Sequence, residues 1–139
     1  MSALRSCITT LLFTLLLLGL LASCQRPDKS SGIQARKMLS HVQTLVQSDS
    51  FPDNDSLLTL PIRFFTQHGP DSLLAQAYYL QGEILRRHYF MLRASDAYMK
   101  ALELCPDTNQ LRFRILLAQA KTCRIEKIAS EAAYHLDQA

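Results

Sequence analysis

The stretch that decides the fold is residues 82–106, GEILRRHYFMLRASDAYMKALELCP. It carries small residues at Gly82 and Ala94, and it ends at Pro106. We expect the two small residues to let two antiparallel helices approach closely, with the ring of Tyr98 filling the space between them. Pro106 ends the second helix because proline cannot donate the helical hydrogen bond. The stretch therefore predicts a tightly packed pair of short helices.

The spacing within this stretch resembles the signature of the tetratricopeptide repeat (TPR) family at nearly every position, namely Gly82-x2-Leu85-x8-Ala94-x3-Tyr98-x2-Ala101-x4-Pro106. Gln81 departs from the family, which prefers Leu there. The turn HYFM, residues 88–91, also departs, because the family usually has a polar turn at this place. The resemblance implies an all-α fold in which antiparallel helix pairs stack into a superhelix.

The same spacing recurs later in the chain, as Ala120-x2-Cys123-x8-Ala132-x3-Leu136-x2-Ala139. A looser copy lies upstream, as Leu58-x3-Ile62-x2-Phe65-x4-Pro70, and its first helix would begin in a loop. The resemblance therefore covers residues 72–139 well and residues 33–70 loosely. It predicts a short TPR-like superhelix with one strong, one fair and one degenerate repeat.

Hydrophobic periodicity and helix breakers predict about six helices in the mature chain. Their approximate bounds are 33–47, 56–68, 72–88, 92–104, 109–123 and 127–139. Pro61 lies inside the second of them, where it would remove a hydrogen bond. That helix is therefore either kinked or begins later, near Leu60.

Residues 1–23 predict an export signal. Arg5 supplies a positive start, and the apolar run over residues 8–21 is shorter than the roughly 20 residues that a membrane-spanning helix needs. The run is followed by a motif that resembles the lipobox of bacterial lipoproteins, Leu21-Ala22-Ser23-Cys24. The resemblance implies that Cys24 is acylated and becomes the first residue of the mature chain. An ordinary cleaved signal and an uncleaved anchor are the alternatives.

Lipidation at Cys24 would leave residues 24–32 as a polar tether and residues 33–139 as the helical domain. Gln25 stands where some lipoproteins carry Asp, so the sequence resembles lipoproteins sorted to the outer membrane. The resemblance implies that the protein is anchored to a bacterial membrane, on the periplasmic face of the outer membrane.

The periplasm is oxidising, so a disulfide between Cys105 and Cys123 must be considered. The two residues lie near opposite ends of one predicted helix. Their separation is then on the order of 20 Å, whereas the Cα atoms of a disulfide lie within about 7 Å. We therefore expect both thiols to be free.

The composition and motifs argue against several classes of protein. A net charge of +3, from 15 basic and 12 acidic residues, is too mild to indicate binding to nucleic acid. Cysteine and histidine spacings typical of zinc sites are absent, so we expect no metal and no cofactor. Nucleophile-elbow, P-loop and dinucleotide motifs are absent as well, and the four histidines are dispersed. We therefore expect a protein that is not an enzyme.

TPR arrays act as non-catalytic scaffolds or adaptors, and the first helix of each pair lines a groove for a peptide. Carried over to this chain, the resemblance implies the groove residues Gln76, Tyr79, Glu83, Arg86, Arg87, Arg114, Lys121 and Arg124. The set is mainly basic, so its partner would be an acidic peptide or the carboxylate at the end of a chain. A solvated helix face that happens to be basic is the alternative.

Repeats of this kind usually need at least three units and a polar capping helix. The last copy stops at Ala139, the position that makes room for a following helix. This predicts an exposed apolar face at the end of the stack. Two explanations stay open: self-association through the C-terminal helix, and a truncated sensor region of a longer signalling protein.

Overall fold

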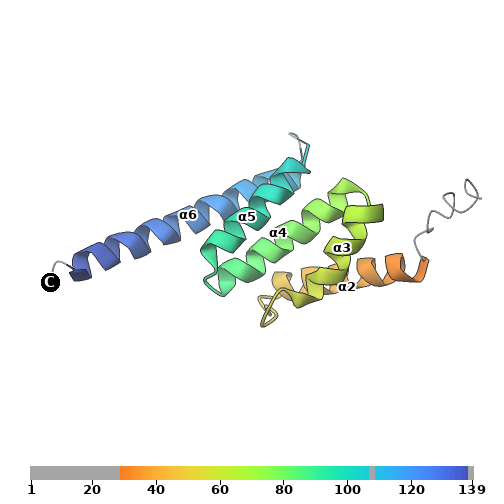
Figure 1. Ribbon diagram of the computed structural model, residues 1–139, viewed down its shortest axis with the longest axis horizontal. Helices are drawn as coiled ribbons and strands as arrows, with labels where there is room; N and C mark the ends of the chain where they lie inside the picture. The colour runs from red at the N-terminus through yellow and green to blue at the C-terminus, as the bar shows by residue number, and fades with distance from the viewer. Residues whose placement is uncertain (1–28, 107–108, 138–139) are drawn as a thin grey trace, which may run out of the picture.

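The computed structural model describes residues 29–106 and 109–137, and they form the all-α fold that the sequence predicts (Figure 1). Its helices are, in chain order, α2 (Lys29–Gln47), the short 3-10 helix η1 (Ser56–Leu58), α3 (Thr59–His68), α4 (Asp71–Arg87), α5 (Met91–Glu103) and α6 (Gln110–Asp137). The expected signal segment and Cys24 lie outside the described residues. Residues 29–32, predicted as tether, instead form the first turn of α2.

Successive helices pack antiparallel and alternate between two layers. One layer holds α2, α4 and α6, because α4 contacts both of the others. The second layer holds α3 and α5, which pack against the helices that precede and follow them (Figure 1). This order places α4 at the centre of the fold, in contact with the other four α-helices.

The pair of α4 and α5 is the most closely packed part of the fold. A Cβ atom added to Gly82 would lie 2.4 Å from a ring carbon of Tyr98, so no side chain fits between the two helices at this position. Tyr98 is fully buried, and so are Ala94 and Ala101 on the same helix. The predicted roles of Gly82, Ala94 and Tyr98 in a tight helix pair are confirmed.

The chain reverses after α4 through a left-handed residue. The N–H of Phe90 donates to the carbonyl of Leu85 (2.9 Å) and the N–H of Tyr89 donates to that of Arg86 (3.1 Å), which is the hydrogen-bond pattern of a Schellman motif. Tyr89 has φ 63°, a conformation that glycine usually supplies at this position. This turn ends α4 and allows α5 to fold back along it.

Pro61 does not kink α3. The helix begins at Thr59, so Pro61 lies in its first turn, where the backbone N–H groups have no partner within the helix. The later of the two predicted starts for this helix is therefore confirmed.

The prediction of separate fifth and sixth helices is wrong. α6 is one continuous helix of 28 residues. The four residues 124–127, Arg-Ile-Glu-Lys, contain no Gly, Pro or Asn to end a helix, and three of them are strong helix formers. The second copy of the repeat spacing, from Ala120 onward, therefore runs along one helix and forms no pair, and the described chain has five α-helices in place of six.

The two cysteines in the described part of the chain are both free, as predicted. Cys105 is buried, and Cys123 is exposed on α6. The structure thus has no disulfide within residues 29–106 and 109–137, and its stability comes from helix packing.

Candidate functional site

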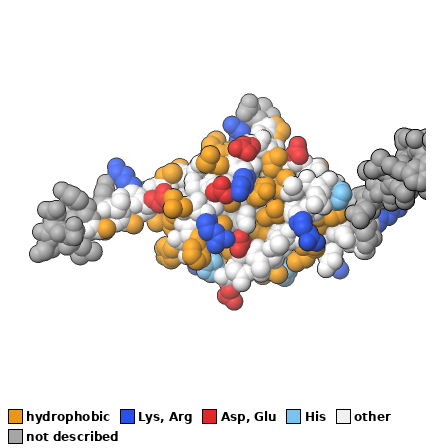
Figure 2. Space-filling model, viewed as in Figure 1, with side chains coloured by type: hydrophobic (Ala, Val, Ile, Leu, Met, Phe, Trp, Pro, Cys, Tyr) orange, Lys and Arg blue, Asp and Glu red, His pale blue; other side chains and the backbone are white. Residues whose placement is uncertain are grey.

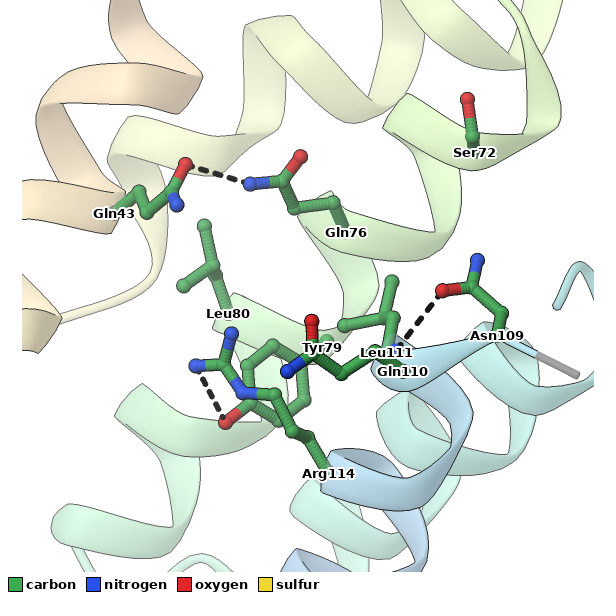
Figure 3. A pocket seen from close by; sticks show the side chains of 9 residues that line it. All are labelled: Gln43, Ser72, Gln76, Tyr79, Leu80, Asn109, Gln110, Leu111 and Arg114. Carbon is green, nitrogen blue, oxygen red and sulfur yellow. Dashed lines mark hydrogen bonds between the residues drawn. The ribbon is translucent and has the colours of Figure 1, made fainter.

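A pocket of about 280 Å³ opens between α2, α4 and α6 (Figure 3). Its walls are mostly polar and come from all three helices and from the residue before α6: Gln43, Ser72, Gln76, Tyr79, Leu80, Asn109, Gln110, Leu111 and Arg114. Three residues predicted for the groove, Gln76, Tyr79 and Arg114, are brought together here.

A second hollow of about 190 Å³ adjoins the first. It is lined by Arg36, Leu39, Ser40, Gln43, Leu73 and Gln76, so it shares Gln43 and Gln76 with the first pocket. We call the two together the α2–α4–α6 groove. None of the described residues that line it is acidic.

The side-chain amides in the groove are positioned by hydrogen bonds. The Nε2 of Gln76 donates to the Oε1 of Gln43 over 2.6 Å, which joins α4 to α2 (Figure 3). The Oδ1 of Asn109 accepts from the N–H of Leu111 at 3.0 Å, as an N-cap residue does, and so fixes the start of α6 beside the pocket. Each paired side-chain amide still has hydrogen-bonding capacity for a ligand.

Arg114 is held over the ring of Tyr79. Its guanidinium carbon lies 5.1 Å from the ring centroid, and its Nη2 is 3.5 Å from the tyrosine hydroxyl. Burial raises the pKa of Tyr79 and the charge of Glu83 adds to this, whereas Arg114 acts in the opposite direction. This contact places the exposed cation of Arg114 at the wall of the groove.

Glu83 and Arg86 are engaged with each other. The hydroxyl of Tyr98 donates to one oxygen of the buried Glu83 at 2.6 Å, and the Nη2 of Arg86 donates to the other at 2.9 Å. Burial and the neighbouring Glu83 raise the pKa of Tyr98 far above its ordinary value. Burial lowers the pKa of Arg86, but the hydrogen bond and charge of Glu83 outweigh this and raise it. The charge of Arg86 is therefore offset inside the fold.

The other predicted groove residues lie elsewhere. The exposed Arg87 has its guanidinium carbon 5.5 Å from the ring centroid of Phe51, in the loop that follows α2. Lys121 and Arg124 are exposed on α6 and line neither hollow. On the face shown in Figure 2, basic side chains are interspersed with acidic and apolar ones.

Several groove residues were missed in the sequence, above all Arg36 and Gln43 on α2. The repeat spacing could not find them, because the first helix of the degenerate upstream copy was expected to begin in a loop. A usable signal was present: Gln43 is a polar residue beside the buried Leu39 and Val42 of α2, and it is half-buried in the structure.

Within the described residues, no group of His, Cys, Asp and Glu side chains is arranged to hold a metal ion. No helix in that part of the chain is both long and apolar enough to cross a membrane. Comparisons with protein-family models, with curated proteins and with solved structures find no match to this chain.

Proposed function

We propose that this protein is a non-catalytic scaffold of TPR-like architecture that binds a segment of another protein in the α2–α4–α6 groove. In this proposal a lipid on Cys24 anchors it to the periplasmic face of the outer membrane. The observation that carries the proposal is the lining of the groove: four side-chain amides and two arginines, from three helices and the residue before α6, with no acidic residue among the described lining.

The alternating layers support the TPR-like part of the proposal. In a TPR array the first helices of successive pairs lie side by side, as α2, α4 and α6 do here. The close approach at Gly82 and the buried Ala94 and Ala101 match the spacing of the family signature. On this assignment α2–α3 and α4–α5 are two pairs, and α6 takes the place of the first helix of a third pair, whose second helix the described residues do not contain.

The chemistry of the groove favours a peptide as the ligand. An extended peptide presents N–H and C=O groups along its length, and a side-chain amide can donate to one and accept from the other. Arg36 and Arg114 lie in different parts of the groove, and each can form paired hydrogen bonds with a carboxylate. The segment would therefore be extended and acidic, or would end in a free carboxylate.

The positive charge of the groove comes from one residue that the sequence predicted, Arg114, and one that it did not, Arg36. Glu83 offsets Arg86, and Arg87 lies against Phe51. Arg36 and Arg114 are both exposed at the groove, so they are the cations available to a ligand. Substitutions at these two residues therefore test the proposal more directly than substitutions at Arg86 and Arg87.

The test is a quantitative pull-down of the full chain from crosslinked membranes of its native host. We expect the double substitution Arg36→Glu and Arg114→Glu to remove the captured proteins. The matched control is Lys37→Glu with Arg63→Glu, which reverses two exposed cations outside the groove and should leave capture unchanged. If the groove variant captures the same proteins in the same amounts as the control, the groove is not the binding site.

The anchor has its own test. Cells grown with a clickable fatty acid should label the wild-type protein and leave a Cys24→Ser variant unlabelled and released from the membrane. Labelling that persists in the Cys24→Ser variant would contradict lipidation at this residue.

A further inference from the structure

One side of α6 has no partner in the described fold. Ile115, Ala118 and Thr122 are buried where α6 packs on α5 and α4. At 100° per residue, the opposite side of the helix carries Phe113, Leu116, Leu117, Ala120, Lys121 and Arg124. All six are exposed, Phe113 to 69%. We call them the outer face of α6.

In α4 the corresponding face is covered. The spacing that aligns Ala120 with Gly82 also aligns Leu117 with Tyr79 and Leu116 with Tyr78. In α4 these three positions contact α5: Gly82 meets the ring of Tyr98, and the rings of Tyr79 and Tyr98 lie 6.3 Å apart. Tyr78 lies under the ammonium of Lys100, also on α5. The outer face of α6 thus repeats a surface that binds an antiparallel helix.

The charge of α6 indicates the kind of helix that fits. α6 contains five basic and three acidic residues, and its first part is the more basic: Glu126 is the one acidic residue in 110–130, and Glu131 and Asp137 follow. Lys121 and Arg124 are exposed within one turn of the apolar side chains. The outer face of a second copy contains no acidic residue and so offers these cations no partner of opposite charge, whereas an acidic helix would neutralise them.

We propose that the outer face of α6 binds an acidic amphipathic helix of another protein, which lies antiparallel to α6 as α5 lies along α4. The apolar residues of that helix cover Phe113, Leu116, Leu117 and Ala120, and its acidic residues meet Lys121 and Arg124. This surface is distinct from the α2–α4–α6 groove, so the proposal stands or falls independently of the groove.

The test uses two synthetic helical peptides of about 18 residues, a length sufficient for several helical turns. Both carry Leu and Ala on one face, with Glu on the other face of the first peptide and Lys on that of the second. The full chain is held in neutral lipid nanodiscs, and binding is followed by fluorescence anisotropy. We expect the Glu peptide to bind at least about tenfold more tightly than the Lys peptide.

Two variants locate the binding. Lys121→Glu with Arg124→Glu should reverse the preference, so that the Lys peptide binds more tightly. Phe113→Ser with Leu117→Ser should weaken both peptides at least about tenfold. The matched controls are Lys37→Glu with Arg63→Glu for charge and the exposed Leu92→Ser for hydrophobicity. Because all these residues are exposed, circular dichroism should show an unchanged helix content.

Several outcomes would overturn the proposal. Equal affinity for the two peptides, or a preference that the Lys121 and Arg124 substitutions leave unchanged, would exclude an acidic helix at this face. A dimer in light scattering that Leu117→Ser dissociates would identify a second copy as the occupant. Binding to anionic vesicles that is stronger than peptide binding and lost in the same variants would identify a lipid surface.

Discussion

α4 and α6 share one pattern of spacing but differ in what surrounds them. α4 is covered by neighbours on both sides, whereas α6 is covered on one side and exposes Phe113 and Leu117 on the other. This difference in coverage arises because α4 is followed by a turn, whereas α6 continues without one. After α4 the chain turns at Tyr89 and returns as α5, but after Ala120 it passes through good helix formers and continues straight. Small residues thus set how closely two helices can approach, and a turn decides whether the chain supplies the second helix.

The largest effect should come from emptying the space between α4 and α5. Tyr98→Ala removes a fully buried ring, and we expect it to lower the free energy of unfolding by about 3–5 kcal/mol. Phe113→Ala, at an exposed aromatic residue of α6, should change it by less than about 0.5 kcal/mol. Urea denaturation followed by circular dichroism measures both. Similar losses in the two variants would mean that α6 is covered as α4 is.

A side chain added in the narrow space between α4 and α5 should lower the free energy of unfolding by a smaller amount. Gly82→Ala places a Cβ atom against the ring of Tyr98. The ring cannot move away, because it is fully buried and its hydroxyl is hydrogen-bonded to Glu83. We expect a loss of about 2 kcal/mol from this overpacking. The comparison in α6 is Ala120→Leu, at the position aligned with Gly82. Its larger side chain meets solvent, so this variant should be neutral in the same denaturation experiment. A neutral Gly82→Ala would show that the two helices can separate freely.

The stability of the α4–α5 pair should also fall at alkaline pH. Tyr98 has its pKa raised by burial and by Glu83, so the folded state keeps the phenolic proton that the unfolded chain loses near pH 10. Stability from Tyr98 is therefore complete below about pH 10 and is lost above it, by up to about 1.4 kcal/mol per pH unit. Denaturation between about pH 9 and pH 11 should show a steeper loss for wild type than for Tyr98→Phe. Parallel losses would exclude this role.

The smallest effect should come from the turn that makes the pair. Tyr89 is 79% exposed and has φ 63°, which a residue with a Cβ atom adopts at a cost. We expect Tyr89→Gly to raise the free energy of unfolding by about 1 kcal/mol. Thermal denaturation measures the change. A loss of stability would show that the side chain of Tyr89 makes contacts that outweigh its backbone strain.

The sequence predicted the fold class and the α4–α5 pair well because local signals agreed there. Gly82, Tyr98 and Pro106 all favour the same helix pair, and the structure brings the first two into contact. The error in α6 arose because the repeat spacing was followed without a signal for a turn. Residues 124–127 contain no helix breaker, and a continuous helix is the default for such a stretch.

The candidate site was harder to predict than the fold. The positions carried over from the repeat spacing lie on α4 and α6, so Gln76, Tyr79 and Arg114 were included. Arg36 and Gln43 on α2 were not, because which helix faces α4 is a property of packing. The spacing also could not show that Glu83 would bind Arg86, since this depends on the side-chain arrangement around Tyr98.

Amide hydrogen exchange of the full chain measures the difference between α4 and α6 most directly. We predict that the amides of α4 and α5 exchange together and slowest, whereas those of α6 beyond Thr122 exchange much faster, because residues 123–130 are exposed or half-buried. Addition of the acidic helical peptide should slow exchange in α6 and leave α4 unchanged. Protection throughout α6 equal to that of α4, in the protein without peptide, would contradict an open outer face on α6.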